Sequence, residues 1–159
     1  MQTTLDQYAA GAGARLGADV PCSLMVRRDG VVRQVASNDD RAAACDRVEE
    51  RDGSGPCITA IDELSSVVVE DLDTDERWPA WNRTARSFGF RTFVALPGYV
   101  DEATTVALNA YSEGPALWAA DRVVQMDLYV QELAAALQSV PTAPLRGAWV
   151  PTARRPARP

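Results

Sequence analysis

Apolar residues follow two different periods along the chain, one typical of helices and one typical of strands. Residues 120–138 carry apolar side chains at alternating steps of three and four, which predicts a long helix with a single apolar stripe. The stripe consists of Val123, Met126, Val130, Leu133 and Leu137. Short apolar runs instead predict five strands, at residues 22–26, 31–36, 67–69, 92–96 and 105–111.

Turn and cap residues separate these segments and place the other helices. Asp29-Gly30 predicts a hairpin between the first two strands, and Asn38-Asp39-Asp40 is suited to cap the helix that follows. Gly89 stands where a helix would end, and a short polar hairpin is expected around Asp101-Glu102. The remaining helices are expected at residues 4–16, 41–48, 58–64 and 78–88.

The order of these elements favours the α+β class. We expect one antiparallel sheet of five to six strands, with the terminal helices on one face and the middle helices on the other. Residues 1–140 are expected to form this single domain. Residues 141–159 are rich in proline and arginine, which predicts a disordered tail.

Composition excludes several classes of chemistry. The 159 residues include no histidine, which removes His-dependent catalysis and His-ligated zinc or haem. A net charge of -6 disfavours nucleic-acid binding, and no apolar stretch predicts a membrane span or signal segment, so we expect a cytoplasmic protein. The three cysteines, Cys22, Cys45 and Cys57, lack zinc-site spacing, and no metal or cofactor is expected.

Five segments in order resemble the GAF domain family, and in particular the GAF part of actinobacterial GAF–ANTAR proteins. The most informative are the glycine turn Gly53-Ser54-Gly55-Pro56-Cys57 and the later Asp75-Glu76-Arg77-Trp78-Pro79. The others are residues 19–24, residues 88–97 with their Phe-Gly-Phe-Arg-Thr start, and Ala107-Leu108-Asn109-Ala110-Tyr111-Ser112. The resemblance covers about residues 20 to 138 and implies a GAF/PAS-like fold and a sensory or regulatory role.

The chain departs from the GAF–ANTAR pattern at three places. Glu102 and Val106 replace glycines that are usual in the family. No ANTAR region, the RNA-binding output module of these relatives, follows the last helix, so we expect a stand-alone GAF domain.

Cys57 supports two alternative interpretations. A cysteine at a helix N-terminus is expected to have a lowered pKa and to serve as a redox-active or ligand-contacting thiol, whereas free cysteines often simply fill apolar space. The chain also resembles the free methionine-(R)-sulfoxide reductases, single GAF domains that use three cysteines. Cys57 and Cys45 match two of these, but residues 73–91, where the attacking cysteine is expected, contain none. The resemblance therefore leaves this enzyme as an alternative using Cys57.

Strand alternation predicts which side chains face a ligand pocket. On the fifth strand, Asn109 and Tyr111 share a face, opposite the apolar Val106, Leu108 and Ala110 that should pack on the terminal helices. Aromatic residues between positions 78 and 93 are either the wall of this pocket or core packing, and Asn109 and Ser23 either contact a ligand or make structural hydrogen bonds. The predicted ligand-binding set is Ser23, Met25, Cys57, Ile61, Trp78, Trp81, Phe93, Asn109 and Tyr111.

The functional prediction is a sensory or regulatory domain without catalysis. Its expected partners are a small molecule, a regulatory protein and a second copy of the chain. Val124 and Leu128 lie beside the apolar stripe of the last helix and either mediate pairing of terminal helices in a homodimer or are ordinary exposed residues. A ligand-free dimerisation module is the remaining alternative.

Overall fold

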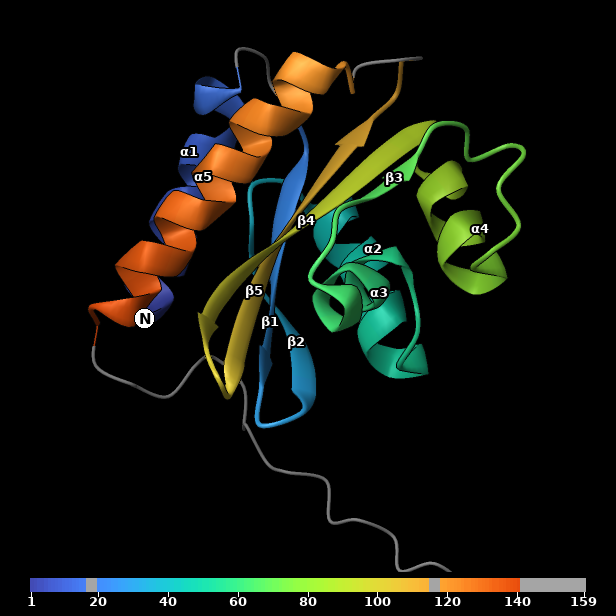
Figure 1. Ribbon diagram of the computed structural model, residues 1–159. Coiled ribbons are helices and arrows are strands. Elements are labelled where there is room, and N and C mark those ends of the chain that lie inside the picture. The colour runs from blue at the N-terminus through green and yellow to red at the C-terminus, as the bar shows by residue number, and fades with distance from the viewer. Residues whose placement is uncertain (17–19, 115–117, 141–159) are drawn as a thin grey trace, which may run out of the picture.

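A five-stranded antiparallel sheet forms the centre of the molecule. The computed structural model describes residues 1–16, 20–114 and 118–140 (Figure 1). The strands run in the order β2-β1-β5-β4-β3, so the first and last long strands of the chain lie side by side in the middle. Their bounds are β1 Cys22–Arg28, β2 Val31–Ser37, β3 Val67–Val69, β4 Thr92–Asp101 and β5 Thr104–Ser112.

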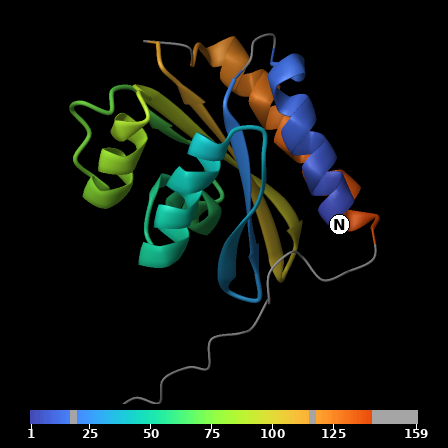
Figure 2. The same cartoon turned by 180° about the vertical axis from the view of Figure 1, so that it is seen from behind.

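Helices cover both faces of this sheet. The terminal helices α1 and α5 lie against one face, and α2, α3 and α4 lie on the opposite side, as the two views from front and behind show (Figures 1 and 2). Their bounds are α1 Gln2–Arg15, α2 Asp40–Asp52, α3 Pro56–Glu63, α4 Pro79–Ser87 and α5 Ala120–Gln138. The predicted α+β architecture is therefore confirmed, with five strands among the described residues.

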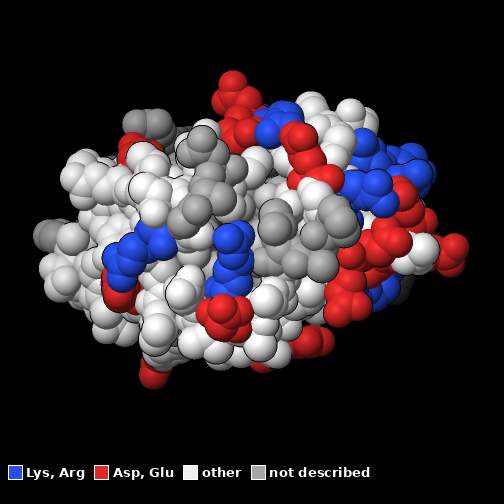
Figure 3. Space-filling model, turned by 90° about the horizontal axis from the view of Figure 1, so that it is seen from above, with Lys and Arg blue, Asp and Glu red and all other residues white. Residues whose placement is uncertain are grey.

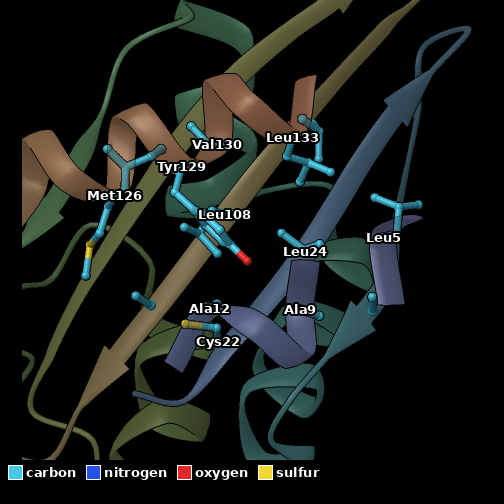
Figure 4. Packing of buried hydrophobic residues seen from close by; sticks show 14 of the residues in the cluster. Leu5, Ala9, Ala12, Cys22, Leu24, Leu108, Met126, Tyr129, Val130 and Leu133 are labelled. Carbon is cyan, nitrogen blue, oxygen red and sulfur yellow. The ribbon is translucent and has the colours of Figure 1, made fainter. Parts of the chain in front are cut away.

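The face of the sheet under the terminal helices is lined mainly by apolar side chains. Met126, Val130 and Leu133 of α5 point toward Leu108 of β5 and Leu24 of β1, and α1 adds small side chains (Figure 4). Two contacts fasten the helices to each other: the Tyr129 hydroxyl donates to the Tyr8 carbonyl at 2.8 Å, and Arg15 pairs with Glu132 at 2.7 Å.

Local sequence signals explain the turns and helix ends. Asp29 and Gly30 both have positive φ, as a two-residue hairpin requires, and the Asp39 side chain accepts from the Arg41 amide to begin α2. Gly89 follows the end of α4 with a φ of +85°. These predictions are confirmed.

β4 is longer than its predicted end at Leu96. It continues through Pro97 to Asp101 and pairs with β5 along this length. β3 covers β4 only from Phe93 to Ala95, so beyond that point β4 is an edge strand, where proline is tolerated. The predicted tail at residues 141–159 lies outside the described residues.

Candidate functional site

A buried carboxylate, Asp46, lies between α2 and the central strands. It is fully enclosed, and its Oδ1 atom accepts from Asn109 Nδ2 at 2.9 Å and from the Tyr111 hydroxyl at 3.3 Å. Asn109 and Tyr111 project from the same face of β5. Ser23 lies opposite Asn109 on the neighbouring strand β1. The alternation predicted for β5 therefore places Asn109 and Tyr111 beside the middle helices, while Val106, Leu108 and Ala110 pack under α1 and α5.

Glu49, one turn after Asp46 on α2, joins two helices. It is also fully buried, and its Oε2 atom accepts from the backbone amides of Cys57 at 2.9 Å and Ile58 at 3.2 Å. These are the second and third residues of α3, whose amides have no partner within the helix. Gly55 lies directly against the Glu49 side chain, since a Cβ atom there would lie 2.2 Å from Oε2. The absence of a side chain at Gly55 thus leaves room for the Glu49 carboxylate.

Four buried polar atoms of this cluster have no hydrogen-bond partner among the described residues. They are Ser23 Oγ, Asp46 Oδ2, Glu49 Oε1 and Asn109 Oδ1. Ser23 lies near Asp46 but not in hydrogen-bond geometry. Buried polar atoms are normally paired, with other protein atoms or with ordered water, so such a concentration needs an explanation. We refer to Ser23, Asp46, Glu49, Asn109 and Tyr111 together as the buried polar cluster.

Aromatic rings close the cluster on the side of α4. Trp81 is 2% exposed and lies edge-on to Phe93 at 4.8 Å between ring centroids. Its Nε1 atom donates to the Tyr111 hydroxyl at 3.4 Å. Phe90 and Phe93 lie against Tyr111 at 4.7 and 4.8 Å. The main surface depressions of the described residues are lined by side chains other than Trp81, Phe93 and Tyr111, and one of them, beside α4, reaches Phe90.

Burial raises the pKa of both carboxyls. It raises the pKa of Asp46 to about 7, although the hydrogen bonds from Asn109 and Tyr111 oppose the shift. The pKa of Glu49 is also raised, by burial first and then by the charge of Asp46, against the two amides that favour its ionised form. Asp46 therefore changes its protonation state near neutral pH.

The cysteines are free and buried. The prediction that the start of a helix lowers the pKa of Cys57 is wrong, because burial and the nearby Glu49 and Asp46 carboxylates raise the pKa instead. Burial also raises the pKa of Cys22 to about 12 and that of Cys45 further. Cys57 therefore matches the space-filling interpretation of its position, and the amides at the start of α3 serve Glu49.

The residues predicted to bind a ligand lie together on the α2–α4 side of the sheet. Trp78 is only partly buried, and its ring lies 6.3 Å from that of Trp81. The others are buried: Ser23, Met25, Cys57, Ile61, Trp81, Phe93, Asn109 and Tyr111. That they bind a ligand stays a prediction.

Sequence reasoning missed Asp46 and Glu49. Both stand on the face of α2 that also buries Ala42 and Cys45. An acidic residue three or four positions from such small residues was the available signal, because it places a charge on the core-facing side of the helix.

The outer surface around α4 is strongly charged. Arg86 pairs with Asp73 at 3.1 Å, and Arg77 pairs with Asp75 at 2.6 Å while stacking over Trp78. Figure 3 shows blue and red atoms crowded together on the α4 side, which is at the right in this view.

Two searches of the described residues were negative. No helix there combines the length and apolarity needed to cross a bilayer. No group of cysteine and acidic side chains in these residues has the arrangement of a metal site.

Comparison with known proteins supplies the family. The family model described as "GAF domain" matches residues 1–137. A domain of a two-component sensor histidine kinase from Sinorhizobium meliloti is similar with a TM-score of 0.67 and 16% identity, covering 87% of this chain and 90% of the other. The GAF domain region of a membrane protein from Geobacter sulfurreducens is similar with a TM-score of 0.67 and 15% sequence identity. The match covers 87% of this chain and 93% of the other.

An enzyme is also among the similar structures. The type II free methionine-R-sulfoxide reductase from Thermoplasma acidophilum has a TM-score of 0.61 at 11% identity, covering 85% of this chain and 94% of the other. Identities this low show a shared fold only. Among curated proteins no match was found.

Proposed function

This chain belongs to the GAF domain family, and we propose that it is a cytoplasmic sensory or regulatory domain that binds a small molecule beside the buried polar cluster. The observation that carries the proposal is the set of four unpartnered polar atoms enclosed between the sheet and α2. A domain that acted only through its surface would have no use for two carboxyls in its core, because burying them opposes folding.

The mechanism that we propose uses the segment from Asp71 to Phe90. This segment carries Trp81, and α4 packs against α2 on the side of the sheet away from the terminal helices. A ligand beside Asp46 would bind one arrangement of Trp81 better than another and so shift the population of α4 positions. We propose that β5 transmits this shift to α5. Asn109 and Tyr111 face the ligand side of the sheet, and Leu108 and Ala110, which alternate with them along β5, pack under α5.

We propose no catalysis. Sulfoxide reduction needs an accessible thiolate and a resolving thiol. Cys57 is fully buried with a raised pKa, and residues 73–91 hold no cysteine. Purified protein with free methionine-R-sulfoxide and a dithiol should therefore show no turnover.

Native mass spectrometry of freshly purified protein tests the sensory proposal. We expect a small molecule that is retained in the native spectrum and released on denaturation, and we expect Trp81→Leu to retain less of it because α4 closes less well. Arg83→Ala on the exposed side of α4 is the matched control and should retain as much as the wild type. A bare protein, together with no thermal shift across a metabolite panel, would instead indicate the ligand-free dimerisation module.

We propose a homodimer through α5. Val124 and Leu128, one turn apart on this helix, are 57% and 59% exposed, and Leu64 of the neighbouring α3 end is 54% exposed. Exposed apolar groups of this kind gather at interfaces. Val124→Glu with Leu128→Glu should convert a dimer to a monomer in light scattering, whereas Gln125→Glu on the same helix should not. A wild-type monomer at high concentration would contradict the proposal.

A further inference from the structure

The unpartnered atoms of the buried polar cluster share one chemical character. Asp46 Oδ2 and Glu49 Oε1 are carboxyl oxygens, which accept hydrogen bonds when ionised. Asn109 Oδ1 is a carbonyl oxygen, and its orientation is set by the bond that Asn109 Nδ2 makes to Asp46. Ser23 can also donate, and so can either carboxyl while it is protonated. When both carboxyls are ionised, the unpartnered atoms of the cluster are therefore mostly acceptors.

The charge of the cluster points the same way. Asp46 and Glu49 are both fully enclosed, and no arginine forms an ion pair with either among the described residues. The helix start at α3 supplies two amides to Glu49 but nothing to Asp46. Ionisation of both carboxyls in a low dielectric requires a positive charge nearby.

The walls suit a cation with an apolar body. Trp81, Tyr111 and Phe93 lie within 6.3 Å of one another by ring centroid, and aromatic faces attract organic cations. Met25 and Ile61 complete the apolar lining on the same side of the sheet.

From these observations we infer that the buried polar cluster recognises a small organic cation, whose ammonium or amidinium nitrogen donates to Asp46 Oδ2, Glu49 Oε1 and Asn109 Oδ1. This inference rests on the proposed function and names the chemical class of its ligand. Trp81 is buried beside Tyr111, so it has to move when the cation enters, and the charge-assisted bonds compensate for its displacement.

Binding of a cation should depend on pH through Asp46. The titratable groups around it are Glu49 and Cys45 on α2, Cys57 on α3, Tyr111 on β5 and Cys22 on β1, with Arg47 as the nearby cation. Since the pKa of Asp46 is about 7, a cation meets mostly neutral carboxyl at pH 6 and mostly carboxylate at pH 8. Affinity should rise about tenfold over this range, and binding should release protons.

Isothermal titration calorimetry of the full chain tests the inference with amines and their matched alcohols. The probes are ethylamine against ethanol, n-butylamine against 1-butanol, and 2-phenylethylamine against 2-phenylethanol. At least one amine should bind more than tenfold tighter than its alcohol, release protons in buffers of different ionisation enthalpy, and lose about tenfold in affinity in Asp46→Asn and in Glu49→Gln. Both variants keep an oxygen for the existing hydrogen bonds and should fold.

Glu63→Gln is the matched control, since it removes an exposed acid from α3 and should leave amine affinity unchanged. Equal binding of amine and alcohol, amine binding unaffected by Asp46→Asn, or no amine binding at all would each overturn the inference. A neutral or anionic molecule in the native mass spectrum would overturn it while preserving the sensory function. A bare protein that shows neither a thermal shift across the metabolite panel nor amine binding would overturn both.

Discussion

Gly55→Ala should lower the free energy of unfolding by about 3 kcal/mol, a large fraction of the stability of such a domain. The new Cβ would lie 2.2 Å from Oε2 of Glu49 and 2.3 Å from its Cγ and Cδ. Glu49 cannot swing away freely, because it is fully buried and accepts from two amides of α3. The φ of +158° at Gly55 adds backbone strain for any other residue.

Urea unfolding with a matched glycine measures this effect. Gly53 precedes it in the same turn with a φ of +67°, but a Cβ there meets nothing within 4 Å. Gly53→Ala should therefore cost only about 1 kcal/mol, the strain of a left-handed residue. The double variant Gly55→Ala with Glu49→Ala should lose less free energy of unfolding than the two single variants lose together, because the truncated side chain at position 49 no longer clashes with the new Cβ atom. Equal costs at both glycines would show that Glu49 is not held against Gly55.

The folded protein should lose stability as pH rises from about 4 to 7. Burial raises the pKa of Asp46 from 3.8 to about 7, so in this window the folded chain holds a proton that the unfolded chain has released. Each unit of pH in this window therefore lowers the free energy of unfolding. The total loss, reached above pH 7, is about 4 kcal/mol. Glu49 has a raised pKa as well and acts in the same direction.

Asp46→Asn should remove this part of the pH dependence and make the protein more stable than the wild type at pH 8. Unfolding is to be measured by urea at pH 5 and pH 8 for both proteins. Asp75→Asn is the control: Arg77 lowers the pKa of Asp75, so its contribution is lost only as pH falls below about 4 and should not alter the slope between pH 5 and 8. A wild-type stability that is flat or rising over this range would contradict the burial of a neutral Asp46.

Much of the fold follows from local patterns, as three features of the chain show. The period of the last helix, the Asp29-Gly30 turn and the glycine after α4 each depend on neighbours within a few residues, and all were predicted. Strand alternation also assigned Asn109 to the correct face of β5, because the side-chain period of a strand leaves only two choices.

The interior of the candidate site depends on contacts that no local pattern contains. Asp46 reaches Asn109 across 63 residues of sequence, and its spacing from Ala42 indicates the buried face of α2 but not the strand residue that it meets. The lowered pKa expected for Cys57 was wrong for a related reason: a helix start lowers the pKa of a thiol only where water or a cation is near, and burial decided the outcome. The length of β4 depends in turn on its pairing with β5, which continues to Asp101 and Thr104.

The position of β1 between β2 and β5 governs when this chain can fold. β1 pairs with β5 from Cys22–Ala110 to Arg28–Thr104, so the middle of the sheet is completed only after more than a hundred residues are available. Pairings this distant in sequence form slowly. On the ribosome, β1 would emerge long before its inner neighbour, with an open edge and the apolar residues Leu24 and Val26 uncovered. The nascent chain is therefore expected to depend on chaperones until β5 is synthesised.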